Sequence, residues 1–349
     1  MTTPDPAEGT LSTRVSPPAV ATVPPARPGL TWRPLRRSDV PALGALVAAC
    51  ENIDDPPYRT TPAELDEALF DGADRDPESN TLAAVTDGGE LVAYGRVRVL
   101  PGDERIVRAF LGGGVHPSAR RDHLGTEILT WQVDRARQAL AATGKDVPMR
   151  IATYVDDGMT DHAHLLGRAG FAPLRYYTDM RRDLSLPVPA PTPLDGSLSL
   201  EPWTEELDDH IRQAHNEAFA DHWGSEPQTP ETWKEGDAHF APEWSFIVMD
   251  RSTDRTRIAG YLISGRYEQD WDALGYTVGY TDLLGVRRDW RGRRVATALL
   301  GAAMRAYAAS GVQYAGLGVD TDNPTGAFGL YERLGYTATR GSALYTIEL

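Results

Sequence analysis

The alternation of hydrophobic and polar residues between positions 280 and 336 predicts a strand, a turn, a helix, a second strand and a short helix. Residues 280–286 are mostly apolar and end at a charged turn, which is typical of a buried strand. Residues 317–319 are the second buried strand. Between them, apolar residues recur at helical spacing until a glycine at 311: Val295, Leu299, Ala303 and Tyr307.

The short helix is predicted to begin at Asn323 and to end at Gly335. Asparagine is a favourable N-cap, and the following Pro324 suits the first helical position. Its apolar residues share one face: Ala327, Leu330, Tyr331 and Leu334.

The same order of elements occurs earlier in the chain, roughly 170 residues upstream, which indicates a tandem duplication. Residues 1–30 are rich in proline and poor in large apolar residues, so we expect a disordered tail. We predict an N-terminal domain at 31–185, a proline-rich linker at 186–197 and a C-terminal domain at 198–349.

Composition limits the partners of this chain. Its 349 residues carry a net charge of −15, which argues against nucleic acid or an anionic membrane surface as partner. The single cysteine, Cys50, excludes an internal disulfide. No apolar run reaches transmembrane length and the first thirty residues do not resemble a signal peptide, so we expect a cytoplasmic protein. No metal site is expected.

The turn after residue 286 points to a phosphate-bearing cofactor. Five arginines lie within residues 287–294 of this acidic protein. A strand that leads into a helix N-terminus directs free backbone N–H groups and the positive end of the helix dipole at one point. Together these features favour a phosphate site over a solvated turn.

These residues resemble the acetyl-CoA-binding core of the GNAT superfamily of N-acetyltransferases. The family's pyrophosphate loop, Arg/Gln-x-x-Gly-x-Gly/Ala, is matched by Arg291-Gly-Arg-Arg294-Val-Ala296, with Arg294 in place of the central glycine. A second family mark, Asn, then Ala, then Leu-Tyr-Glu-x-x-Gly-aromatic, is matched by Asn323, Ala327 and residues 330–336. The resemblance implies an α/β fold with a mixed sheet (α+β): two tandem domains, each a mostly antiparallel central sheet flanked by helices.

The resemblance also assigns residues. Tyr331 is expected to act as general acid toward the CoA sulfur, and Asp282 is the candidate general base. We expect Arg294 to lie inside the helix without backbone strain. The residues expected to bind acetyl-CoA are Leu284, Gly285, Val286, Arg291, Gly292, Arg293, Arg294, Val295, Ala296, Thr297, Asn323, Ala327 and Tyr331.

The segment from His215 to Pro230 is expected to cover the acceptor pocket. It is rich in residues that recognise cations or stack on rings, although packing explains its tryptophans nearly as well. The candidate substrate-binding residues are His215, Glu217, Asp221, His222 and Trp223.

The internal repeat indicates that the N-terminal copy is degenerate. Val115 matches Val286 and Arg120 matches Arg291, but Leu166 stands where the C-terminal copy has Tyr331. We therefore predict that the C-terminal domain is catalytic.

The predicted activity is transfer of an acetyl group from acetyl-CoA to the primary amine of a small molecule: an amino sugar, an antibiotic or a cysteinyl-sugar-like acceptor. The alternatives are a non-catalytic acyl-CoA sensor and a peptide N-terminal acetyltransferase. The sequence leaves the acceptor open, and the protein could be a monomer or a homodimer.

Overall fold

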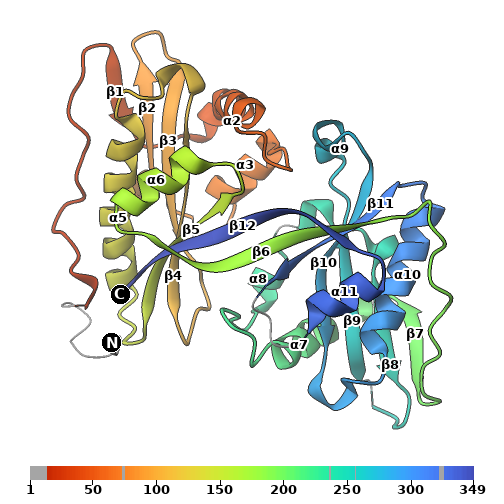
Figure 1. Ribbon diagram of the computed structural model, residues 1–349. Helices are drawn as coiled ribbons and strands as arrows, with labels where there is room; N and C mark the ends of the chain where they lie inside the picture. The colour runs from red at the N-terminus through yellow and green to blue at the C-terminus, as the bar shows by residue number, and fades with distance from the viewer. Residues whose placement is uncertain (1–13, 73–74, 236, 256, 322–325) are drawn as a thin grey trace, which may run out of the picture. The chain divides into compact units, whose positions relative to one another are not determined.

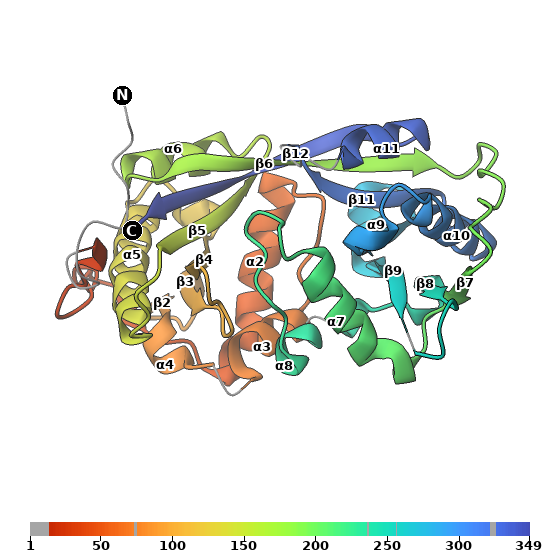
Figure 2. The same ribbon diagram turned by 90° about the horizontal axis from the view of Figure 1, so that it is seen from below.

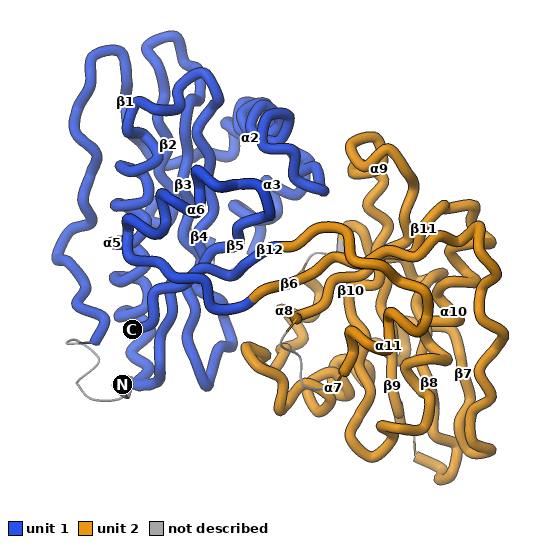
Figure 3. The backbone as a smooth tube through the Cα atoms, in the orientation of Figure 1, with its two compact units in different colours: residues 1–175, 342–349 blue, residues 176–341 orange. Residues whose placement is uncertain are grey.

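The computed structural model describes residues 14–72, 75–235, 237–255, 257–321 and 326–349. The chain forms two compact units (Figure 3). Unit 1 contains Met1–Arg175 and Ser342–Leu349, and unit 2 contains Tyr176–Gly341.

In unit 1 the strands follow one another in the sheet as β1, β2, β3, β4, β5 and the C-terminal part of β12. All pairs are antiparallel except β4 with β5. The elements are β1 (Leu30–Arg33), β2 (Thr81–Thr86), β3 (Leu91–Val99), β4 (Val107–Val115), β5 (Met149–Asp156), α2 (Val40–Asp54), α3 (Pro62–Phe70), α4 (Pro77–Asn80), α5 (Leu124–Ala142) and α6 (Thr160–Arg168).

Unit 2 repeats this arrangement, with its strands in the order β6, β11, β10, β9, β8 and β7, and with β10 and β11 as the parallel pair. The elements are β6 (Ala172–Asp183), β7 (Leu198–Pro202), β8 (Phe246–Asp250), β9 (Ile258–Gly265), β10 (Val278–Val286), β11 (Tyr314–Asp320), β12 (Thr337–Glu348), α7 (Asp208–Ala218), α8 (Pro230–Trp233), α9 (Glu268–Leu274), α10 (Val295–Ala309) and α11 (Ala327–Arg333). Single 3₁₀ turns occur at Arg37–Asp39, Pro117–Ala119, Glu205–Leu207, Asp237–His239, Pro242–Trp244 and Arg288–Trp290.

Helices cover both faces of each sheet because successive strand residues point to opposite sides. In unit 2, Gly260 faces α10 so closely that a Cβ there would meet Val295 at 2.6 Å. The next residue, Tyr261, points to α7 and bonds His215. Unit 1 has the same layering, with α5 on one face and α2 on the other (Figure 1, Figure 2). These sheets confirm the expected α/β fold with two tandem, mostly antiparallel domains.

Two segments differ from the predicted domain boundaries. The chain enters unit 2 at Tyr176, so Tyr177–Asp183 of β6 pairs with β11 rather than with unit 1. Conversely, Ser342–Glu348 of β12 pairs with β5 of unit 1. Strand pairing between residues so far apart in sequence leaves no local signal. Because Tyr177–Asp183 of β6 lies in unit 2, the proline-rich stretch at 186–197 connects two strands of unit 2, β6 and β7.

The described part of the expected tail packs on α5. Val15 is fully buried, and Arg137 donates a hydrogen bond to its carbonyl at 2.5 Å. The Thr22 amide donates to Asp134 at 2.8 Å. Residues 1–13 lie outside the described part of the chain, whereas residues 14–30 are anchored rather than disordered.

Within the described ranges, no helix has both the length and the apolar character needed to cross a bilayer.

Candidate active site

The strands β10 and β11 pair only over their first halves. The parallel register runs from Val278 opposite Tyr314 to Thr281 opposite Leu317, while the strands continue to Val286 and Asp320. Along residues 282–286 the side of β10 that faces β11 therefore has no strand partner among the described residues. The sheet of unit 2 therefore opens along the strand that leads into the arginine-rich turn.

A β-bulge lies where the opening begins. On its other side β10 pairs with β9, and the register shifts between Thr281 and Leu283, so that Asp282 is the extra residue. A bulge re-aims the inserted side chain. In unit 1 the register between β3 and β4 is continuous: Leu111 pairs with Val97 as Thr281 pairs with Ser264, and the inserted Asp282 has no counterpart. The redirected carboxylate is therefore specific to unit 2.

The Asp282 carboxylate is held by an aromatic neighbour. Tyr267 donates a hydrogen bond from its hydroxyl to Oδ1 of Asp282 at 2.9 Å. The His239 ring lies 4.9 Å from the Tyr267 ring, and Tyr280 meets Tyr267 edge-on at 6.1 Å. A Cβ on Gly265 would come within 2.5 Å of the Tyr267 ring and 2.6 Å of Oδ2 of Asp282, so a side chain there would displace this pair.

Surrounding protein raises the pKa of the Asp282 carboxyl to about 6, although the residue as a whole is exposed to solvent. Desolvation is the main cause, and the Tyr267 hydrogen bond and the nearby His239 oppose it. A carboxylate with a pKa near neutrality is suited to accept a proton at physiological pH.

Sequence reasoning missed the partners of Asp282. Tyr267 and His239 lie on separate turns, and Tyr280 reaches Asp179 of β6 with a long 3.4 Å hydrogen bond. These residues come from four segments that only the folded sheet brings together, and no local motif marks them.

Tyr331 lies on α11 beside the opening. Its side chain is buried in the cluster that also contains Leu317 and Val319 of β11 and against which Leu284 of β10 packs. Burial raises the pKa of the Tyr331 hydroxyl to about 12. This hydroxyl has no hydrogen-bond partner within the described residues. Ala327 is the first residue of the same helix, and the predicted cap Asn323 lies outside the described residues.

The arginine-rich turn ends at a strained residue. Arg294 is the N-cap of α10, with φ of 62° in the left-handed region, and Gly292 also has a positive φ of 77°. The expectation of an unstrained, helical Arg294 was therefore wrong: the residue adopts the conformation that glycine favours in this loop. His123, its counterpart in unit 1, has the same conformation, with φ of 61°.

Arg294 also differs from the other arginines of the turn by its lack of partners. Its side chain is exposed and forms no ion pair with any described residue. Arg291 donates to the carbonyls of Val286 and Ala218 at 3.1 and 2.8 Å, which anchors the loop. Arg293 bonds Asp195 at 2.7 Å. The turn thus presents one unpaired cation beside the free N–H groups of Val295, Ala296 and Thr297 at the start of a 15-residue helix.

Two predicted substrate residues instead pair with this turn. Glu217 accepts a hydrogen bond from Nε of Arg287 at 2.7 Å. Asp221 pairs with Arg288. Both carboxylates therefore neutralise arginines of this turn.

His215 is a core residue rather than a surface ligand. It is 6% exposed, bonds the Tyr261 hydroxyl through Nδ1 at 2.6 Å and stacks on Phe219 with ring centres 4.6 Å apart. Burial lowers the pKa of His215 to about 4, so the ring is neutral. Contact with substrate is not compatible with this burial. His222 is half-buried and bonds the Trp223 carbonyl at 3.0 Å.

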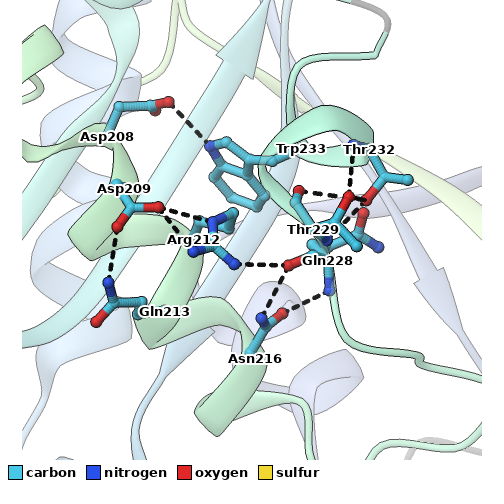
Figure 4. Close-up of polar contacts among 9 residues, drawn as sticks. All are labelled: Asp208, Asp209, Arg212, Gln213, Asn216, Gln228, Thr229, Thr232 and Trp233. Carbon is cyan, nitrogen blue, oxygen red and sulfur yellow. Dashed lines mark hydrogen bonds and ion pairs between the residues drawn. The ribbon is translucent and has the colours of Figure 1, made fainter. Parts of the chain in front are cut away.

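The segment between α7 and α8 is fastened to α7 (Figure 4). Arg212 donates to the Gln228 carbonyl at 2.8 Å, and Asn216 exchanges two hydrogen bonds with the backbone of Gln228. Trp233 donates from its indole to Asp208 at 3.1 Å. These contacts fix the C-terminal end of the segment that was expected to cover the acceptor to α7, on which its N-terminal end lies.

No group of three or more His, Cys, Asp or Glu residues is arranged to hold a metal ion in the described part of the chain.

Comparison with known proteins places the chain among acetyltransferases. A family model described as "Acetyltransferase (GNAT) family" matches residues 47–154 and 208–336, one segment in each unit. A mycothiol acetyltransferase from Streptomyces coelicolor is 28% identical over 278 residues, which are 76% of this chain and 79% of that protein. A mycothiol acetyltransferase from Streptomyces avermitilis is 30% identical over 242 residues, which are 67% of this chain and 70% of that protein.

Solved structures show the same tandem arrangement. A GCN5-related N-acetyltransferase from Sphaerobacter thermophilus superposes with a TM-score of 0.68 at 25% identity, covering 94% of this chain and 97% of the other. A tandem GNAT protein from the clavulanic acid biosynthesis pathway has a TM-score of 0.62 at 17% identity, covering 91% of this chain and 98% of the other, and it supports the fold alone.

Proposed function

Because the chain belongs to the GNAT acetyltransferase family, we propose that unit 2 transfers an acetyl group from acetyl-CoA to the primary amine of a small molecule. The observation that carries this proposal is the bulge in β10 at the point where β10 and β11 part, which brings the Asp282 carboxylate against Gly265 and Tyr267. Unit 1 lacks both the bulge and the carboxylate.

The residues around this opening fit acetyl-CoA. Arg294 and the N–H groups of Val295–Thr297 would hold the pyrophosphate, with Gly292 shaping the loop. The side of residues 284–286 that faces β11, which has no strand partner among the described residues, would accept the pantetheine arm as an added strand. When bound, acetyl-CoA supplies the acetyl group as a thioester.

Asp282 is the proposed general base. An amine acceptor arrives as an ammonium ion and must lose a proton before it can act as a nucleophile. An ionised carboxylate with a pKa of about 6 attracts the ammonium and accepts this proton near neutral pH. Tyr267 holds the carboxylate through its hydrogen bond to Oδ1.

Tyr331 is the proposed general acid. Its hydroxyl stays protonated throughout the neutral range because burial raises the pKa to about 12. A protonated phenol beside the opening can donate its proton to the departing thiolate. In unit 1 the equivalent position is Leu166, which is buried and has no proton to give.

We propose that the acceptor is a small molecule that has a primary amine and further polar groups. The relatives named mycothiol acetyltransferase favour a cysteinyl amino sugar. Amino sugars and aminoglycoside-like antibiotics remain candidates of the same chemistry. A location in the cytoplasm stays a prediction.

An amine screen tests this proposal. The full chain is incubated with acetyl-CoA and a panel of primary amines, and release of the CoA thiol is followed. We expect turnover with at least one small amine in wild type and loss of turnover in Asp282→Asn. Binding of acetyl-CoA without turnover on any amine would instead favour a non-catalytic acyl-CoA sensor, and turnover on peptide N-termini alone would move the assignment to that acceptor class.

A further inference from the structure

A second polar site lies in unit 1, away from the residues discussed above. A pocket of about 190 Å³ is lined by Arg75, Arg96, Arg98 and Arg135 together with Asp76 and Asn80. Four arginines thus line the pocket, with one acidic residue among its described lining residues. In a chain with a net charge of −15, this local excess of positive charge is unusual.

Arg96 is the residue least compensated by the protein. The residue is half-buried, its guanidinium makes no hydrogen bond or ion pair with any described residue, and desolvation lowers the pKa of the group. Enclosing a cation without a counter-charge is costly, so buried charges are normally paired. An anion in the pocket would supply the missing partner.

The remaining lining residues do not neutralise this charge. Arg135 bonds two neutral amide oxygens, those of Asn80 at 2.9 Å and Gln138 at 3.3 Å. The Asp76 carboxylate caps α4 by accepting from the Ser79 amide at 3.1 Å. Arg75 and Arg98 have contacts of their own, so the excess charge rests on Arg96 and Arg135.

The internal repeat shows that the fold does not require this pocket. Tyr94 and Tyr261 occupy equivalent places, each opposite a glycine of the next strand. Two residues further along, unit 2 has Ile263 where unit 1 has Arg96. An apolar side chain thus serves the same strand position in unit 2.

Unit 2 also fills the corresponding space. The register of β2 against β3 and that of β8 against β9 make Trp244 the counterpart of Asn80. Its indole is fully buried and donates to Ser310 at 2.8 Å, at the end of α10. The counterpart of Ser310 in unit 1 is Ala139, which lines the pocket. Unit 1 therefore has a pocket and arginines where unit 2 has a tryptophan.

We propose that this pocket of unit 1 binds a tetrahedral oxyanion, a phosphate or sulfate group, through Arg96 and Arg135. Arginine suits this role because its planar fork binds phosphate oxygens with two parallel hydrogen bonds. The site is independent of the acetyl-CoA site proposed in unit 2.

Calorimetric titration of the full chain with inorganic phosphate, at low ionic strength and without acetyl-CoA, tests the proposal. We expect a saturable site that binds at least tenfold more weakly in Arg96→Gln. Arg168→Gln is the matched control, since Arg168 is an exposed arginine of the same unit, and it should bind as wild type does. Arg294→Gln should keep the Arg96-dependent site, which separates it from phosphate bound at the start of α10.

Circular dichroism of each variant confirms folding, and Arg135→Gln replaces Arg96→Gln if the latter does not fold. Competition by glycerol 3-phosphate would identify a phosphate monoester as ligand, whereas absence of competition would identify the free anion. Undetectable phosphate binding in wild type, or equal weakening in Arg96→Gln and Arg168→Gln, would overturn the proposal.

Discussion

The Tyr267 hydroxyl donates a 2.9 Å hydrogen bond to Oδ1 of Asp282, the residue that the bulge inserts into β10. This pair joins a backbone irregularity to a carboxylate whose pKa is raised to about 6. The bulge redirects the Asp282 side chain, and the hydrogen bond from Tyr267 holds it in place. The pair has no counterpart in unit 1, where the strand register is regular and no residue is inserted into β4.

Replacement of the base should reduce activity. Asp282→Asn removes the proton acceptor, and we expect the rate with a confirmed acceptor to fall by about 10²- to 10⁴-fold. Acetyl-CoA affinity, measured by calorimetry, should stay unchanged. An unaltered rate would remove Asp282 from the role of base.

The same variant tests the pH dependence of stability. The folded-state pKa of Asp282, about 6, is above its ordinary value of 3.8. Between these values the folded state holds more protons than the unfolded state, so the free energy of unfolding falls as pH rises through this window. Denaturation from pH 4 to 7 should show this contribution in wild type and not in Asp282→Asn.

The Tyr267 hydrogen bond should be visible in the pH–rate profile. Because it favours the charged form of Asp282, Tyr267→Phe should raise the pKa of that carboxyl further. The acidic limb of the kcat/KM profile should then move to higher pH, with His239 and Tyr280 unchanged around the carboxyl. The control is Tyr276→Phe, whose ring packs on Tyr314. Identical acidic limbs in wild type and Tyr267→Phe would contradict a positioning role.

Arg294 should be replaceable by glycine with a gain in stability. Its left-handed backbone carries a steric cost that glycine avoids, so Arg294→Gly should stabilise the protein by up to about 1 kcal/mol. His123→Gly is the matched control in unit 1, since it has the same conformation. Both variants should gain stability in chemical denaturation, but only Arg294→Gly should weaken acetyl-CoA binding. A loss of stability in both variants would show that the left-handed conformation of Arg294 and His123 does not destabilise the protein.

His215 should prove structural. His215→Phe removes the partner of the buried Tyr261 hydroxyl, which should cost about 1–3 kcal/mol. The folded-state pKa of His215, about 4, lies below its ordinary 6.5, so in wild type its contribution to stability is lost as pH falls from 6.5 through 4. The variant should lack this dependence, and the exposed His210→Phe should retain it. A change in acceptor KM without loss of stability would return His215 to the substrate site.

The sequence predicted the local parts of this account and missed the long-range ones. Residues 280–286 and the apolar repeat from Val295 to Tyr307 follow from hydrophobic periodicity, and the structure has both elements. The bulge at Asp282 left no pattern, because it depends on the register against β9. The same reason explains why Tyr267 and His239 were missed.

The errors share a physical cause. The polar composition of the segment after His215 suggested a binding surface, but burial of His215 and the pairing of Glu217 with Arg287 are tertiary contacts. The left-handed Arg294 could have been inferred from the glycine that the family has there. The crossing of β12 to the sheet of unit 1 had no sequence signal.

The most direct test of the central claim is a calorimetric titration of the full chain with acetyl-CoA. If unit 2 holds the cofactor through the start of α10, wild type should bind one acetyl-CoA per chain. Arg294→Glu should abolish this binding by charge reversal, and the matched His123→Glu in unit 1 should leave it intact. Binding that survives Arg294→Glu and is lost in His123→Glu would contradict the assignment of the active site to unit 2.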